Sequence, residues 1–169
     1  DHFSGLVVGN ASILAVCEPS FGSDCARKLK SGKVKEPVEQ LKLFTQDRIS
    51  QLHDIEYHLD CGYIVMHDRN YLSSAVYQGM HLGIDKVLSS QQLLYPNPDI
   101  CFLFLPTADF LWDRIQARAT SDLDMSKKYL SRVVDSYNAV ASKIELEGYL
   151  KVLKEDMLCR SAEHVADYI

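Results

Sequence analysis

Apolar residues in this chain alternate between short strand-like runs and longer stretches with a helical period. Three short runs rich in branched and aromatic residues predict buried strands: Ala11 to Val16, Tyr63 to Met66 and Ile100 to Leu105. The longest helical period covers Pro37 to Cys61, with Pro37 in its first turn and Gly62 just after its end. Strands separated by helices predict a parallel sheet that is covered by helices on both faces.

The same periodicity extends to the end of the chain. It predicts helices over Leu72 to Leu88, Ala108 to Ala119 and Met125 to Ile144, a strand over Tyr149 to Leu153 and a terminal helix from about Ser161. A length of 169 residues suits one domain with a substantial core and is short for two. We therefore expect a single α/β domain over residues 1–169, with three α/β/α layers and a central, mostly parallel sheet.

Charge and composition narrow the classes of partner. The formal net charge of -5 argues against a surface that coats nucleic acid or anionic membranes, which needs excess Lys and Arg. The chain contains no apolar run of roughly 20 residues and no signal-peptide pattern. The five cysteines are odd in number and form no CxxC pair, so neither a disulfide framework nor a zinc site is expected. These features predict a soluble, cytoplasmic protein that binds neither nucleic acid nor membrane.

Chemistry-bearing residues follow the second predicted strand, at the sheet edge where open α/β sheets bind ligands. Asp68 and Arg69 come directly after it. Alone, such a pair is typical of a helix cap or a surface ion pair. The next residues add hydroxyl groups, a ring and an amide within one strand-to-helix segment: Ser73, Ser74, Tyr77 and Gln78.

This segment, DRNYLSSAVYQG at residues 68–79, resembles the DRYxxSSxAYQG motif of the thymidylate kinase family. Asn70 departs from the family pattern, which has a ring there. LFTQDR at residues 43–48 is similar to the family's LFxADR segment. Weaker similarities follow in the family's order: CEPS at 17–20 to REPGG, Pro98-Asp99 to a PD pair before a strand, and Arg114 with Arg118 to an arginine-bearing helix before a lid. The resemblance implies a P-loop nucleoside monophosphate kinase fold.

Phe44 and Arg48 are four residues apart, which places them on one face of a helix. A ring able to stack on a pyrimidine and a guanidinium able to reach its carbonyl edge would then enter one pocket. The alternative is that Phe44 belongs to the core and Arg48 is a solvated surface charge. In combination with the DRNYLSSAVYQG segment, the binding interpretation is favoured.

The resemblance implies a reaction and a set of roles. The reaction is transfer of the ATP γ-phosphoryl group to dTMP with Mg²⁺, in a homodimer. Arg69 would bridge the two phosphates, with Asp68 orienting it or holding a water near the metal. The acceptor nucleotide would be bound by Phe44, Arg48, Arg69, Ser74, Tyr77 and Gln78. The ATP side would use Arg114 and Arg118, with a lid at about 119–127, and no protein ligand for the metal is assigned.

Several positions depart from the family pattern. Cys17 stands where the family has an arginine, Leu105-Pro106 where relatives often show an aspartate, and Ser121 to Asp124 supplies no lid arginine. No GxxxxGK[ST] phosphate loop occurs in the 169 residues. We expect such a loop, with its strand and helix, to precede Asp1. The alternatives are a non-catalytic nucleotide-binding relative and a kinase for another pyrimidine nucleotide.

Overall fold

The computed structural model describes residues 7–8, 11–117, 126–144 and 150–154. The chain divides into two compact units, residues 1–96 (unit 1) and 97–169 (unit 2).

The described part of unit 1 contains three strands: β1 (Val7–Val8), β2 (Ala11–Cys17) and β3 (Ile64–Asp68). The strand β1 pairs antiparallel with β2, and β2 pairs parallel with β3. In this register Cys17 lies opposite Asp68, and the backbone N–H of Glu18 donates to the carbonyl of Asp68 at 3.1 Å. The parallel pairing therefore brings the residues that follow β2 and β3 to the same edge.

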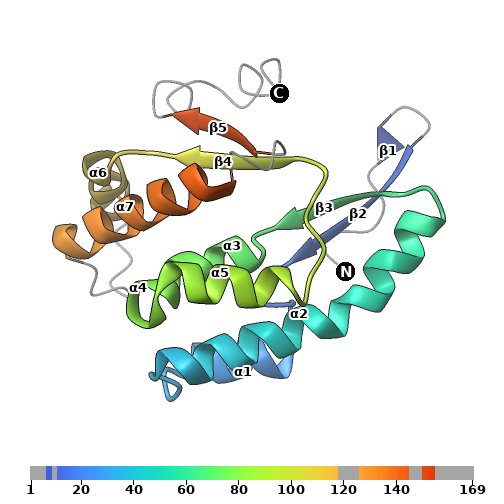
Figure 1. The fold of residues 1–169 in the computed structure, drawn as a ribbon, viewed down its shortest axis with the longest axis horizontal. Coiled ribbons are helices and arrows are strands. Elements are labelled where there is room, and N and C mark those ends of the chain that lie inside the picture. Colours follow the sequence, from blue (N-terminus) through green and yellow to red (C-terminus); the bar gives the residue numbers. More distant parts are fainter. Residues whose placement is uncertain (1–6, 9–10, 118–125, 145–149, 155–169) are drawn as a thin grey trace. The chain divides into compact units, whose positions relative to one another are not determined.

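Two helices connect β2 to β3: α1 (Asp24–Lys30) and α2 (Pro37–Asp60). The Oγ of Ser23 caps α1 by accepting from the N–H of Ala26 at 3.0 Å. Pro37 opens α2, where its missing N–H costs no helical hydrogen bond. In Figure 1, α1, α2 and α5 lie below β2 and β3. The long helix predicted from Pro37 is confirmed to within one residue at its end.

The single helix predicted over Leu72 to Leu88 is wrong, because this segment is three helices: α3 (Tyr71–Tyr77), α4 (Gly79–Leu82) and α5 (Ile84–Gln92). Gly83 has φ of 96°, a left-handed conformation that no α-helix continues through. A Cβ on Gly79 would lie 3.0 Å from the Cα of Ile84, so the turn between α4 and α5 requires glycine at position 79. The hydrophobic period does not reveal either feature, because one is a backbone conformation at Gly83 and the other is a close backbone approach at Gly79.

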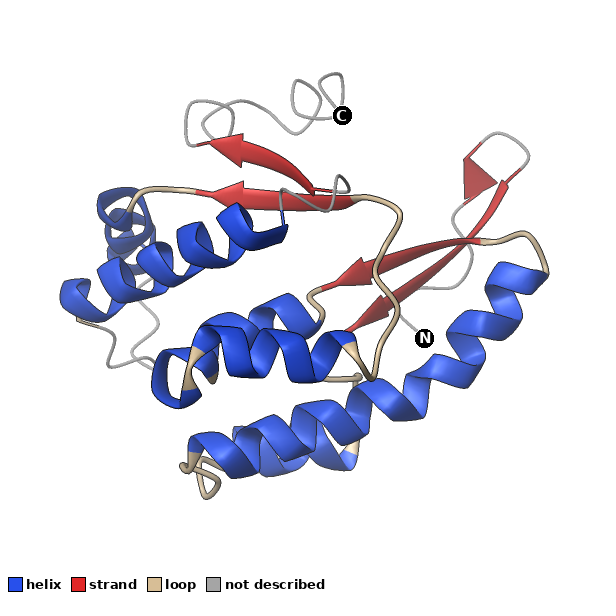
Figure 2. Ribbon diagram, viewed as in Figure 1, coloured by secondary structure: helices blue, strands red, loops and turns tan. Residues whose placement is uncertain are grey.

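The described part of unit 2 also combines parallel strands with helices. Its strands β4 (Cys101–Leu105) and β5 (Leu150–Lys154) pair parallel, and its described helices are α6 (Ala108–Ala117) and α7 (Lys127–Ile144). The helix α7 contacts both strands (Figure 2). It buries one apolar face: Leu130, Val133, Val140, Ala141 and Ile144. The α/β class predicted from the sequence is confirmed, whereas the terminal helix from Ser161, Arg118 and residues 119–125 of the lid lie outside the described residues.

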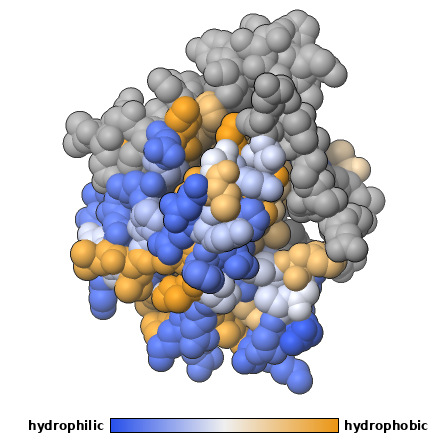
Figure 3. All heavy atoms as spheres, turned by 90° about the vertical axis from the view of Figure 1, so that its right-hand side faces the viewer, coloured by the Kyte–Doolittle hydropathy of each residue, from blue (hydrophilic) through white to orange (hydrophobic). Residues whose placement is uncertain are grey.

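Large apolar side chains are exposed on several elements of unit 1, including Ile49 and Leu59 on α2 and Ile64 and Met66 on β3. The prediction of a buried strand at β3 is therefore wrong in its burial, because alternate residues of this strand face solvent. On the face drawn in Figure 3, hydrophobic and hydrophilic residues lie beside one another. Among the residues that the structure describes, no helix is long and apolar enough to cross a membrane.

Candidate functional site

The guanidinium of Arg48 is the centre of a buried polar cluster in unit 1. Arg48 is 1% exposed, although it carries a permanent charge. Its Nε donates to Oε1 of Glu18 at 2.7 Å and its Nη2 to Oε2 at 2.5 Å. This two-point pairing joins α2 to the residue that follows β2, and it sets the plane of the guanidinium.

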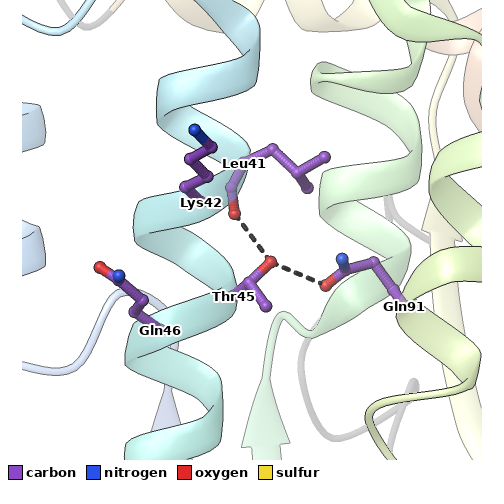
Figure 4. A pocket seen from close by; sticks show the side chains of 5 residues that line it. All are labelled: Leu41, Lys42, Thr45, Gln46 and Gln91. Carbon is purple, nitrogen blue, oxygen red and sulfur yellow. Dashed lines mark hydrogen bonds between the residues drawn. The ribbon is translucent and has the colours of Figure 1, made fainter.

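Two further elements supply partners to Arg48. Its Nη2 donates to Oγ of Ser74 on α3 at 3.1 Å, and its Nη1 donates to Oε1 of Gln91 on α5. The hydroxyl of Thr45 lies 3.1 Å from the same Gln91 oxygen and 2.8 Å from the carbonyl oxygen of Leu41 (Figure 4). Arg48 is thus held by side chains from a strand end and two helices.

Burial shifts the pKa values of the titratable groups around Arg48. Desolvation raises the pKa of Glu18, and the hydrogen bonds and charge of Arg48 oppose that rise. Burial and, to a lesser extent, the charge of Arg48 lower the pKa of His67 to about 4, so its imidazole is neutral at pH 7. Burial raises the pKa of Tyr95 to about 12, which keeps its hydroxyl protonated.

Neutral His67 lies between two of these groups. Its Nδ1 is 3.5 Å from the hydroxyl of Tyr95, and its Nε2 is 3.5 Å from Oε1 of Glu18. Since the imidazole is neutral, the second contact is not an ion pair. Among the described residues, His67 Nε2 is a buried side-chain nitrogen with no hydrogen-bond partner.

A second carboxylate fixes the turn that follows β2. The Oδ2 atom of Asp47 accepts from the backbone N–H of Ser20 at 2.7 Å and from its hydroxyl at 3.0 Å. Asp47 and Arg48 are adjacent on α2 and together bind Ser20 and Glu18. The turn after β2 is therefore fastened to α2 at two points.

The residues at the end of β3 are exposed to solvent, unlike those of the buried cluster. Asp68 and Arg69 are both exposed. Arg69 has φ of 65°, a left-handed conformation that costs a non-glycine residue roughly 1 kcal/mol or more. The next residue, Asn70, caps α3, since its Oδ1 accepts from the N–H of Leu72 at 3.0 Å. The departure at Asn70 from the family's aromatic residue thus has a local structural role.

The other residues predicted for the acceptor site lie on the same helices. Gln78, at the end of α3, is buried, and its Nε2 donates to Oε1 of Gln40 on α2 at 3.3 Å. Tyr77 and Phe44 are half-buried. The structure brings Arg48 and Ser74 into contact and links Gln78 to α2.

A comparison with known protein families shows which family the chain belongs to. A family model described as "Thymidylate kinase" matches residues 13–152. The chain belongs to the thymidylate kinase family. This family has a P-loop kinase fold, so both the predicted family and the predicted fold class are confirmed.

Individual thymidylate kinase relatives match over different lengths. The chain is 27% identical over 143 residues to the "Probable thymidylate kinase" of Archaeoglobus fulgidus, covering 80% of this chain and 72% of that protein. It is 39% identical over 85 residues to the thymidylate kinase of Rickettsia typhi, covering 48% and 39%. It is 39% identical over 83 residues to that of Rickettsia canadensis, covering 47% and 38%. The chain thus spans about two fifths of the length of the Rickettsia relatives.

Of the two arginines predicted for the ATP side, Arg114 lies in the described part of unit 2, and Arg118 lies outside the described residues. Arg114 is exposed on α6, with its Cζ 5.6 Å from the ring centre of Phe110. In the described segments of the chain, no cluster of three or more His, Cys, Asp and Glu residues could hold a metal ion.

The sequence indicates no role for three residues of the buried cluster, His67, Gln91 and Tyr95, and it indicates Glu18 only as part of the CEPS segment. A weak signal existed for Gln91, because it lies one helical turn after Val87 and Leu88, where a buried face continues. A polar residue at such a position indicates a buried hydrogen-bond partner but does not identify it.

Proposed function

We propose that the protein is a thymidylate kinase that transfers the γ-phosphoryl group of ATP to dTMP, giving dTDP. The observation that carries the proposal is the buried Arg48, which Glu18, Ser74 and Gln91 hold by hydrogen bonds. A buried charge is costly to assemble, and the full set of partners retained around Arg48 supports a specific role for it. It lies in the unit that carries the DRNYLSSAVYQG segment.

Arg48 is suited to select a pyrimidine that has a carbonyl group at its outer edge. Four of its five N–H groups are used by the four hydrogen bonds described above, and we assign the fifth, on Nη1, to the base. A guanidinium only donates, so it favours thymine, which has a carbonyl oxygen where cytosine has an amino group. Phe44 stacks on the ring, and Ser74 and Gln78 complete the contacts to the base edge.

The phosphates are assigned to the open end of β3. Arg69 bridges the acceptor and transferred phosphoryl groups, and Asp68 orients it or holds a water near the metal. Tyr77 packs against the deoxyribose. Phosphoryl transfer depends mainly on holding two polyanions in line and neutralising their charge, which exposed cationic groups at a sheet edge do well. Mg²⁺ bound with ATP would supply further neutralisation of the phosphates, and Asp68 would lie near it through a water.

The remaining assignments follow from the family and belong to the same proposal. Arg114, Arg118 and a lid at about 119–127 serve ATP, and residues 1–169 form part of one kinase domain that assembles as a homodimer. The proposed substrates are dTMP and ATP.

The test is a coupled assay of ADP release by the full-length protein with ATP, Mg²⁺ and dTMP, with dUMP and dCMP as competitors for specificity. We expect turnover with dTMP, and a loss of at least about 100-fold in kcat/KM for Arg69→Met, since a group that touches the transferred phosphoryl is removed. Calorimetric dTMP binding without turnover would support a non-catalytic nucleotide-binding relative. Preferred turnover of dCMP would reassign the base specificity, and absence of both binding and turnover would refute the proposal.

A further inference from the structure

Gln91 is a buried amide on a helix that carries no recognised motif. It is 4% exposed and shares the buried face of α5 with Val87 and Leu88. The packing of these two apolar residues anchors the helix. The amide of Gln91 therefore approaches α2 from a rigid support.

Two donors converge on the Oε1 atom of Gln91. They are the Nη1 of Arg48 and the hydroxyl of Thr45, both from α2. Because a guanidinium has no acceptor, the amide atom that faces Arg48 has to be the oxygen, which determines the orientation of the amide group. Figure 4 shows Thr45 placed between the Leu41 carbonyl and Gln91.

We propose that Gln91 is a specificity-determining residue that positions the Arg48 guanidinium for the pyrimidine carbonyl. This inference rests on the proposed function, since it takes Arg48 as the group that reads the base. Glu18 binds Nε and Nη2 and so sets the plane of the guanidinium. Gln91 then occupies one of the two N–H groups of Nη1, leaving a single N–H with a defined direction for the base.

Without the Gln91 oxygen, Nη1 presents two N–H groups, and either can bind water or a differently placed carbonyl. Cytosine retains a carbonyl at another ring position, so a less restricted donor accepts it more readily. The effect of losing Gln91 is therefore on the choice between dTMP and dCMP, beyond any effect on the amount of folded protein.

The experiment measures dTMP and dCMP binding to the full-length protein by isothermal titration calorimetry, which does not require turnover. In Gln91→Met, which keeps the side-chain length but removes the oxygen, we expect the ratio of the dCMP to the dTMP dissociation constant to fall about tenfold. Gln91→Glu keeps an oxygen acceptor and is expected to retain the ratio within about twofold. The matched control is Gln46→Leu, because Gln46 is an exposed amide on α2 that points away from Gln91 in Figure 4.

A wild-type ratio in Gln91→Met would overturn the inference, as would equal losses in Gln91→Met and Gln91→Glu, which would indicate a packing role. If Gln91→Met does not fold, Gln91→Asn decides by the same criterion, since its oxygen is withdrawn from Nη1 by one methylene. Arg48→Lys separates the two proposals: if it loses discrimination while Gln91→Met does not, only the role of Gln91 fails. If neither variant changes the ratio, or the wild type binds no dTMP, both fail.

Discussion

The two arginines that face the proposed nucleotide are held in opposite ways. Arg48 is buried and bound by Glu18, Ser74 and Gln91, whereas Arg69 is exposed at the end of β3 in a left-handed conformation. The first is pre-organised by neutral and charged partners before any ligand arrives. The second lies in solvent, where long-range attraction of phosphates is effective. The difference matches the tasks proposed for them, since reading a base edge needs fixed geometry and binding phosphates needs accessible charge.

The largest effect should come from removing the buried charge. Arg48→Met leaves the Glu18 carboxylate buried without its partner, which we expect to lower the free energy of unfolding by about 3–5 kcal/mol. Arg69→Met removes an exposed side chain, so it should change the free energy of unfolding by no more than about 0.5 kcal/mol. Urea denaturation of both variants measures the contrast, and equal losses would contradict the distinction between a closed and an open region.

The free energy of unfolding should depend on pH through the titration of His67. Its pKa is about 4 in the folded protein against 6.5 for the unperturbed group, so the unfolded state binds the proton more tightly. Stability from this group is fully present above pH 6.5 and is lost as the pH falls towards 4, by roughly 3 kcal/mol in total.

His67→Gln removes this titration, so the free energy of unfolding should decline less steeply in the variant than in the wild type between pH 6.5 and 4. Parallel curves from urea denaturation at several pH values would show that His67 is not buried in its neutral form. The difference between the two curves isolates His67, because Glu18, Arg48 and Asp68 are present in both proteins.

A smaller effect is expected at the backbone of Arg69. Glycine adopts φ of 65° without steric cost, so Arg69→Gly should raise the free energy of unfolding by about 0.5–1 kcal/mol once its greater chain entropy is counted. Arg69→Ala retains the strain and serves as the control. Under the proposed function both variants lose turnover, so stability and activity would move in opposite directions for Arg69→Gly. A destabilised Arg69→Gly in thermal or urea unfolding would contradict this account of the strand end.

The smallest expected effect is a difference in chemical reactivity between two cysteines. Burial raises the pKa of Cys25 to about 11, with a further contribution from the charge of Asp47, whereas Cys61 is exposed at the end of α2. Iodoacetamide at pH 7.5 should alkylate Cys61 much faster than Cys25, because the thiolate is the reacting species. Peptide mass spectrometry over a time course measures both rates. Comparable rates would mean that the region near Asp47 opens readily.

The sequence by itself determined the local elements and the acceptor motif. Short apolar runs predicted β2, β3 and β4, and the helical period from Pro37 predicted α2, because both patterns depend only on residues that are close in the sequence. Its motifs also indicated the family, which the family model confirms. The spacing of Phe44 and Arg48 predicted a shared helix face, and the roles of these two residues stay predictions.

Only the tertiary structure decided what Arg48 touches. Its partners Glu18, Ser74 and Gln91 are 30, 26 and 43 residues away in the chain. They meet because the parallel register of β2 and β3 sets the position of Glu18 and because α3 and α5 turn back at Gly79 and Gly83. Hydrophobic periodicity records which face of an element is buried, and it carries no information on which polar group of another element lies opposite. That choice depends on strand register and helix packing, so the burial of Arg48 was visible only in the folded chain.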